Sequence, residues 1–536
     1  MLLVDAGDLL QGTLESNMDE GRTIVDAFNA LGYQAAALGN HEFDFGPEGP
    51  AATPTDGPGP AMPEGPAGIG LHPDPAAPAV VGSGFSRTNP SPAENPRGAL
   101  EARLRQAHFP FLAANLIDTR TSQPVTFPNT SPSVVVEIAG VRVGLVGLIT
   151  EPALTFTAAP NVAGLATTPL LPALVEQATR LRAEGATLII AVAHAGGRCT
   201  RAGALDDLSS CEPDAEIFQL ASALPKGLVD AVVAGHRHDP LAREVNGIPI
   251  IQSGWGARTF GRVDFTIDRA SRQPRAHRVH QPQPICTHVT PGQDGCATAD
   301  APGSRAVEYE GAIVARGGDL ATLVAPAVDA GRARRALSLE SVSSVHLPHD
   351  ESGQSPAGDL AADWMLALDP AADAALTNTT GFRSDIAEGP FTYGALHALI
   401  PFDNQRVAIA LTGAQLARVI EGNLTRSGSM VVLGGVRAAA SCIGGAVRVS
   451  LHRLSGAPVA DHERLRVVTT DFLSTGGDAF LTPVMPVQVL ERSSGILREE
   501  IAAWLQAHPA SWGADLLNRP PRISGVPSRP MACGGK

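Results

Sequence analysis

Short apolar runs recur through the first half of the chain, and most of them stop at a turn that contains glycine. The runs occupy residues 2–4, 34–38, 134–138, 141–149, 188–192, 229–233 and 248–251. A short apolar run bounded by turn residues is typical of a buried strand. Helical patterns stand between several of the runs, at residues 23–31, 98–107 and 171–184. This alternation predicts an α/β domain built in layers.

Candidate metal ligands stand directly after four of these runs. They are Asp8, Asn40, His194, His236 and His238. The carboxyl ends of parallel strands share one edge of a sheet, where open α/β folds place their sites. Each residue alone is more often a turn former or a core side chain, but their joint occurrence at strand ends favours a site. A carboxylate, a carboxamide and three imidazoles suit Zn, Mn, Fe or Co better than Ca or Mg.

The composition excludes several classes of function. The chain has 40 basic and 54 acidic residues, so its formal charge of −14 argues against a general nucleic-acid or anionic-membrane binder. Its only lysines, Lys226 and Lys536, lie outside any Walker loop, and no G-x-S-x-G elbow is present. The longest apolar stretch, at 134–149, is interrupted by two charged residues and a glycine, so no membrane span is expected.

The six cysteines favour disulfides because their number is even. Cys199 with Cys211, and Cys286 with Cys296, are close enough in sequence to close small loops. Six unrelated buried thiols are the alternative, and the last two cysteines are left unassigned. Disulfides indicate an oxidising compartment. Residues 1–8, however, contain neither a charged n-region nor a cleavage site, so no signal peptide is expected in this chain.

Two irregular regions divide the chain. Residues 47–97 contain 13 prolines and 8 glycines without apolar periodicity, which predicts an irregular surface insertion. A second irregular region, rich in Pro, Gln, His and Gly, runs from about residue 272 to residue 318. The sequence therefore predicts a first domain at 1–285, a linker at 286–318 and a second domain at 319–536. Helices near 358–368 and 412–421 suggest that the second domain is mixed α/β.

Four segments resemble successive motifs of the calcineurin-like metallophosphatases. They are residues 7–12, 39–44, 193–196 and 235–238. The resemblance is to the 5′-nucleotidase family in particular, because residues 378–383, 401–404 and 472–478 resemble that family's carboxyl-terminal substrate domain. It implies a layered αββα metallophosphatase sandwich followed by a mixed α/β substrate-binding domain.

The resemblance assigns metal-binding roles residue by residue. It makes Asp8 the carboxylate that bridges two divalent ions, which are Zn, Mn, Co or Fe. Asn40, His194 and His236 then complete one site, and His238 belongs to the other. Two such ions hold phosphate oxygens and activate a water for in-line attack on phosphorus.

The resemblance also implies a catalytic pair that does not bind metal. His41 stabilises the transition state or protonates the leaving oxygen. Asp44 orients this imidazole and favours its charged form.

In the second domain the resemblance implies a nucleotide site. Phe402 and Phe472 sandwich the base, although core packing is the alternative for both rings. Arg383 holds phosphate or ribose oxygens. Further hydrogen bonds to the nucleoside come from Asn378, Asn404 and Asp478.

The chain also departs from the family pattern. It starts after the family's first Asp-x-His motif, so the site around His238 keeps only Asp8 and His238, too few ligands for a well-held ion. Truncation is the favoured explanation, because an edge strand is missing too, and a one-metal or inactive derivative is the alternative. Thr379-Thr380 replaces two glycines, and Glu351 stands where the family commonly has an arginine.

The leading hypothesis is a periplasmic or secreted metal-dependent phosphoesterase that hydrolyses nucleotides. The first alternative is a non-catalytic nucleotide-binding protein whose metal site has decayed. The others keep the scaffold but change the substrate to a 2′,3′-cyclic nucleotide, a nucleotide sugar or a sulfur ester. The sequence makes no prediction of the oligomeric state.

Overall fold

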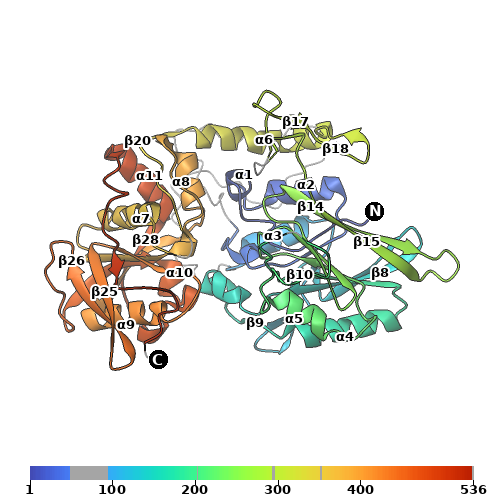
Figure 1. The fold of residues 1–536 in the computed structure, drawn as a ribbon, viewed down its shortest axis with the longest axis horizontal. Helices are drawn as coiled ribbons and strands as arrows, with labels where there is room; N and C mark the ends of the chain where they lie inside the picture. The colour runs from blue at the N-terminus through green and yellow to red at the C-terminus, as the bar shows by residue number, and fades with distance from the viewer. Residues whose placement is uncertain (49–94, 202, 292–295, 351–352, 534–536) are drawn as a thin grey trace. The chain divides into compact units, whose positions relative to one another are not determined.

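The computed structural model describes residues 1–48, 95–201, 203–291, 296–350 and 353–533 (Figure 1). The chain forms two compact units. The first includes Arg97–Leu154 and Val162–Ala327, and the second includes Thr155–Asn161 and the described residues from Val328 onward. Most of the predicted insertion at 47–97 lies outside the described residues, as does Glu351.

The first unit is built on two sheets. One has four strands in the order β1-β2-β3-β6, and the other has six in the order β12-β13-β11-β10-β8-β7. The strand bounds are β1 Val4–Asp5, β2 Ala35–Ala37, β3 Phe111–Leu112, β6 Thr130–Ser131, β7 Ser133–Ile138, β8 Val141–Ile149, β10 Leu188–His194, β11 Ala231–Ala234, β12 Leu241–Val245 and β13 Ile248–Gln252. The first sheet is parallel throughout, and in the second only β7 and β12 are antiparallel.

Helices cover the six-stranded sheet on the face that looks away from the other sheet. Leu174 and Leu181 pack on this face beside Ile189 of β10. Val143 of β8 and Ile190 of β10 point the other way, toward the first sheet. Each residue of β10 is buried. This explains its continuous apolar run, because both faces of the strand are covered. The helix bounds are α1 Leu14–Asn17, α2 Arg22–Leu31, α3 Gly98–Gln106, α4 Leu170–Ala183 and α5 Glu216–Ala223.

Every apolar run named in the sequence overlaps a strand, and the three helical patterns overlap α2, α3 and α4. Smaller elements accompany these strands and helices. They are the short 3₁₀ helices η1 His41–Phe43, η2 Ala153–Phe156 and η3 Ala159–Val162, the sheet of β4 Leu116–Asp118, β5 Gln123–Pro124 and β9 Leu165–Thr167, and the hairpin of β14 Thr259–Ile267 and β15 Pro274–Pro284.

The segment predicted as a linker, 286–318, contains short paired strands. They are β16 His288–Val289 with β17 Arg305–Ala306, and β18 Glu308–Tyr309 with β19 Ala312–Ile313. Helix α6 begins at Gly318 and ends at Arg335, so the division between the units lies inside it.

The second unit has a five-stranded mixed sheet in the order β24-β21-β27-β23-β28. Two three-stranded sheets accompany it, β22-β20-β29 and β26-β25-β30. The strand bounds are β20 Ser338–Ser343, β21 Ala374–Asn378, β22 Gly389–Thr392, β23 Gln405–Thr412, β24 Val431–Gly434, β25 Val436–Ile443, β26 Ala446–Arg453, β27 Arg464–Thr470, β28 Gln488–Ile496, β29 Ser511–Trp512 and β30 Ile523–Ser524.

Local sequence signals explain where the helices of the second unit begin. Ser355 caps α7 by accepting the Gly358 N–H, and Thr412 with Gln415 forms a capping box at α9. The bounds are α7 Pro356–Ala367, η4 Thr379–Gly381, α8 Tyr393–Leu399, α9 Gly413–Leu424, α10 Asp471–Ser474, η5 Gly477–Ala479, η6 Thr482–Val484 and α11 Leu497–Ala507. None of the described helices has the length and apolar character that a bilayer crossing requires.

All six cysteines are paired. The two predicted loop closures, Cys199–Cys211 and Cys286–Cys296, are confirmed, and the alternative of unrelated thiols is wrong. The unassigned Cys442 and Cys533 form a third disulfide across 91 residues. This pairing is invisible in the sequence because only the folded chain brings β25 near residue 533.

The long-range disulfide is expected to stabilise the protein more than a short one. A crosslink across 91 residues removes more entropy from the unfolded chain than one across 10 residues. We expect C442A/C533A to lower the free energy of unfolding by about 2–5 kcal/mol, and by roughly 2 kcal/mol more than C286A/C296A. Urea unfolding followed by circular dichroism measures both values. Equal losses would contradict the entropic explanation.

Candidate active site

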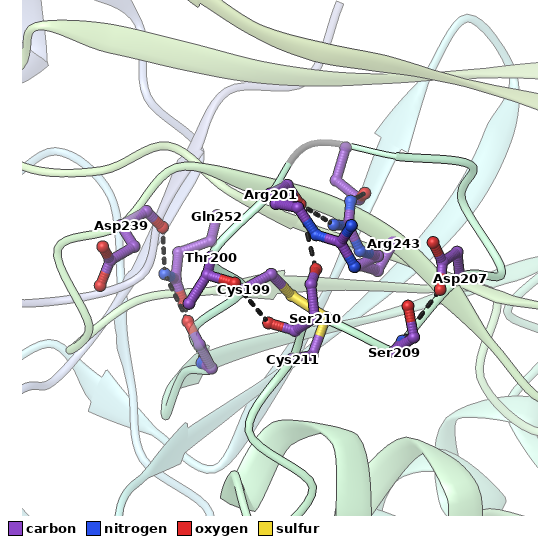
Figure 2. Close-up of a disulfide and its surroundings, with 12 residues drawn as sticks. Cys199, Thr200, Arg201, Asp207, Ser209, Ser210, Cys211, Asp239, Arg243 and Gln252 are labelled. Carbon is purple, nitrogen blue, oxygen red and sulfur yellow. Dashed lines mark hydrogen bonds between the residues drawn. A yellow bond between two sulfur atoms is a disulfide. The ribbon is translucent and has the colours of Figure 1, made fainter.

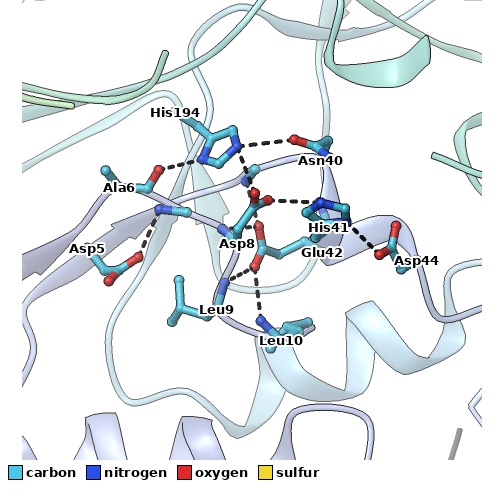
Figure 3. Close-up of polar contacts among 12 residues, drawn as sticks. Asp5, Ala6, Asp8, Leu9, Leu10, Asn40, His41, Glu42, Asp44 and His194 are labelled. Carbon is cyan, nitrogen blue, oxygen red and sulfur yellow. Dashed lines mark hydrogen bonds and ion pairs between the residues drawn. The ribbon is translucent and has the colours of Figure 1, made fainter. Parts of the chain in front are cut away.

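Three predicted ligands meet in the first unit, each at or just after the carboxyl end of a strand. Asp8 follows β1, His194 ends β10, and His236 follows β11. One ligand atom of each lies within 4.8 Å of those of the other two. Because β10 and β11 are parallel neighbours, their carboxyl ends bring the two imidazoles to one sheet edge. The side chains of Asp8 and His194 point toward each other in Figure 3.

The orientation of His194 is set by its backbone partner. Its Nδ1 lies 2.8 Å from the Ala6 carbonyl oxygen, which can only accept a hydrogen bond, so Nδ1 carries the proton. Nε2 then faces the other polar groups, at 3.1 Å from Oδ2 of Asp8 and 3.2 Å from Oδ1 of Asn40. Although burial disfavours its charged form, the Asp8 carboxylate raises the pKa of His194. A cation would therefore bind at Nε2 in place of a proton, with the ring held as metal-binding imidazoles usually are.

The charges at this site favour a cation. Burial alone would raise the pKa of the Asp8 carboxyl, but the neighbouring His194 and His41 hold it well below its usual range. Burial, helped by the charge of His194, lowers the pKa of His236 to about 3. The site thus offers an ionised carboxylate beside an imidazole that is neutral at pH 7, which are the forms that bind divalent metals.

This donor set fits one transition-metal ion. A carboxylate and two imidazoles, with the Asn40 amide oxygen beside them, match the ligands that Zn, Mn, Fe and Co accept. Within the described ranges, no second group of three or more His, Cys, Asp and Glu side chains converges in this way.

His41 and Asp44 form the predicted pair. His41 Nδ1 lies 2.6 Å from Oδ2 of Asp44, and the two side chains are 17% and 14% exposed. Asp44 is the last residue of the turn that η1 begins, so the pair forms within one local element. The His41 backbone N–H donates to Oδ1 of Asp8 at 2.8 Å, which links the pair to the candidate metal site.

His238 is not part of the converging group, although it follows the same strand as His236. Its ring stacks on Trp255 with centroids 5.9 Å apart. The Arg258 guanidinium lies 3.9 Å from the Trp255 ring centroid. The sequence predictions did not include these two residues, because their position beside His238 depends on the turn after β13.

The loops that follow His194 and His238 are tied together by a buried glutamine. Gln252 Nε2 donates to the Gly197 carbonyl at 3.1 Å and to the Asp239 carbonyl at 2.5 Å. The Cys199–Cys211 disulfide closes the first of these loops nearby (Figure 2). Both features hold the backbone that leads away from the candidate ligands.

In the second unit, two predicted substrate residues meet across 100 positions of sequence. Asn378 Nδ2 donates to Oδ2 of Asp478 at 2.8 Å and to Oγ1 of Thr380 at 3.0 Å. The Thr380 hydroxyl donates to the same Asp478 oxygen at 3.1 Å. Thr380 replaces a family glycine. Its hydroxyl therefore takes up one hydrogen bond of the Asn378 side chain and one of the Asp478 side chain.

The aromatic residues lie on different elements of this unit. The Arg383 guanidinium lies 5.4 Å from the Phe402 ring centroid. Phe472 lies on α10, and its ring packs against Gly477. A Cβ atom added at Gly477 would come within 2.5 Å of the ring. For Asn404, the structure gives a backbone contact, in which its carbonyl accepts from Leu497 at 2.7 Å.

A fully buried arginine that the sequence analysis missed supports the loop of Phe402. Arg498 Nη1 donates to the carbonyls of Ile400 and Phe402 at 3.0 and 3.3 Å. Its Nη2 donates to Oδ1 of Asp403 at 2.6 Å. Nothing in the amphipathic pattern of α11 marks this arginine, because its partners come from a loop 95 residues earlier.

Comparisons with known proteins agree with these features. Residues 331–484 match the family described as 5′-nucleotidase, C-terminal domain. A probable 5′-nucleotidase of Treponema pallidum is 22% identical over 570 residues, which cover 95% of this chain and 83% of that protein. The solved structure of a 5′-nucleotidase precursor from Thermus thermophilus matches 98% of this chain and 90% of its own, with 20% identity and a TM-score of 0.68. Residues 331–484 thus carry this family's C-terminal domain, and the chain is similar to 5′-nucleotidases over almost its whole length.

These similarities confirm the predicted resemblance, and the solved structure confirms the layered fold followed by a mixed α/β domain. Another relative is much longer than this chain. Endonuclease YhcR of Bacillus subtilis is 24% identical over 434 residues, which cover 79% of this chain but only 29% of that protein.

Proposed function

We propose that the chain is a metal-dependent phosphoric ester hydrolase that acts on nucleotides. The observation that carries this proposal is the convergence of Asp8, His194 and His236 at one sheet edge, next to the His41–Asp44 pair. Similarity to 5′-nucleotidases supports the substrate class. We also propose a periplasmic or secreted location, because three disulfides suit an oxidising compartment.

Asp8, Asn40, His194 and His236 would hold the metal ion. When bound, such a cation supplies Lewis-acid charge to a phosphoryl oxygen and activates water for attack on phosphorus. A second ion, which the family resemblance implies, would use Asp8 and His238. Among the described residues this second ion has no converging set of three protein ligands.

His41 would act on the leaving group. Because Nδ1 faces Asp44, a proton transfer to the leaving oxygen would use Nε2. The Asp44 carboxylate stabilises the imidazolium form, which can donate a proton to the departing alkoxide. Asp44 therefore acts by orienting and charging His41.

The second unit would bind the nucleoside. We propose that Phe402 and Phe472 stack on the base and that Arg383 holds phosphate or ribose oxygens. Polar contacts to the nucleoside would come from Asn378, Asn404 and Asp478.

A substrate panel tests this function. The full chain is stripped with a chelator and then assayed with Mn²⁺, Zn²⁺, Co²⁺ or Fe²⁺ on AMP, 2′,3′-cyclic AMP, UDP-glucose and a sulfur ester. We expect phosphate release from AMP that requires an added metal. Nucleotide binding without turnover of any substrate would select the non-catalytic alternative. Turnover of only the cyclic nucleotide, the nucleotide sugar or the sulfur ester would select that narrower alternative.

Base stacking gives a prediction for Phe402. Removing one stacked ring costs about 1–3 kcal/mol of base binding. We expect Phe402→Ala to raise KM for AMP by about 5- to 150-fold while kcat changes little. Glycerol phosphate, which has no base, is the control substrate and should show an unchanged KM. An equal rise for both substrates would mean that the ring serves the fold of the loop instead.

A further inference from the structure

Glu42 lies under the candidate metal site and is the acidic residue of the 39–44 motif to which no role has been assigned. Its side chain is completely buried. The carboxylate accepts backbone hydrogen bonds from Asp8 at 2.9 Å, Leu9 at 2.5 Å, Leu10 at 3.3 Å and Gly39 at 2.6 Å. Figure 3 shows this carboxylate beneath Asp8, with Leu9 and Leu10 on its other side.

These bonds join two turns that are far apart in the sequence. One turn carries Asp8, and the other carries Asn40 and His41. Asp8 has a φ of 65°, in the left-handed region that non-glycine residues rarely adopt. Three successive N–H groups, from Asp8 to Leu10, point at one carboxylate, as in backbone anion sites. The Glu42 carboxyl group thus stabilises a strained turn.

Both oxygens of the Glu42 carboxyl group act as acceptors in this arrangement. Oε2 accepts from Asp8 and Gly39, and Oε1 accepts from Leu9 and Leu10. A glutamine has one NH₂ group in place of an oxygen, so in either orientation that group would face two N–H donors.

We propose that Glu42 is a positioning residue that clamps the two ligand-bearing turns together, so that Asp8 and Asn40 face His194 before a metal ion binds. The inference rests on the proposed metal site and is independent of the substrate. Groups that hold metal ligands in place in this way orient them for binding, and their loss typically reduces metal affinity about 10- to 100-fold.

Cobalt binding tests the clamp on the full chain. Co²⁺ is titrated into the metal-free wild type, Glu42→Gln and Glu184→Gln, with affinity from calorimetry and ligand geometry from the Co²⁺ absorption spectrum. Glu184, paired with Arg180 on the surface, is the matched control for loss of one charge. We expect E42Q to bind Co²⁺ about 10- to 100-fold more weakly with an altered spectrum, and E184Q to match the wild type.

The outcomes separate the clamp from the metal site itself. If the wild type binds no Co²⁺, the proposed metal site fails. If E42Q binds like the wild type, the clamp is overturned, even where its melting temperature falls. Hydrogen exchange of metal-free wild type provides a measurement that does not depend on the variant folding. We expect slow exchange at residues 8–10 and 39, and free exchange there would overturn the clamp.

Discussion

Asp8→Asn is expected to abolish turnover by removing the charged ligand at the centre of the candidate metal site. Oδ1 of Asp8 accepts the His41 N–H, and Oδ2 faces Nε2 of His194. An asparagine that keeps the first contact would turn its NH₂ group toward His194 and any bound cation. The variant therefore loses a negative charge and places a donor where a cation needs an acceptor.

We expect the metal affinity of Asp8→Asn to fall by more than about 100-fold, because even the loss of a group that only orients a ligand costs about 10- to 100-fold. Elemental mass spectrometry of the purified chain after equilibration with Mn²⁺ or Zn²⁺ measures bound ions, and phosphate release from AMP measures turnover. Asp5→Asn is the matched control, because Asp5 is also an aspartate near the site but bonds to the Gly7 N–H. Full metal content with wild-type turnover in D8N would refute the assigned ligand.

The positions of the candidate ligands could be predicted because they depend on strand ends. Residues 188–192 form a run that is buried on both faces, and His194 ends the strand built on it. His236 follows the parallel neighbour of that strand, so parallel pairing alone places both imidazoles at one edge. Apolar periodicity contains this information, since it determines where strands run and stop.

Other features of the site could not be predicted, because they depend on backbone groups and on contacts between distant segments. Glu42 is an ordinary acidic residue in a turn until the fold brings the Asp8 turn over it. Trp255 stacks on His238 only because the turn after β13 lies beside it. Thr380 was recognised as a departure from the family pattern, but its bond to Asp478 depends on a residue 98 positions away.

His41→Ala is expected to separate chemistry from metal binding. The contact that links His41 to Asp8 uses the backbone N–H, which an alanine retains. The variant should therefore bind metal like the wild type while it loses the imidazole that faces Asp44. Removing a general acid typically costs about 10²- to 10⁴-fold in rate, so we expect kcat for AMP to fall by that factor.

The leaving group shows what the imidazole does. The 4-nitrophenolate ion departs without a proton, whereas the ribose alkoxide of AMP needs one, so general-acid catalysis predicts a much smaller loss with 4-nitrophenyl phosphate. Asp44→Asn should reproduce part of the loss with AMP, because it leaves His41 in place but removes the charge that favours its imidazolium form. Equal losses on both substrates would assign His41 to stabilising the phosphoryl charge of the transition state. Unchanged turnover of both substrates, with full metal content, would exclude His41 from the reaction.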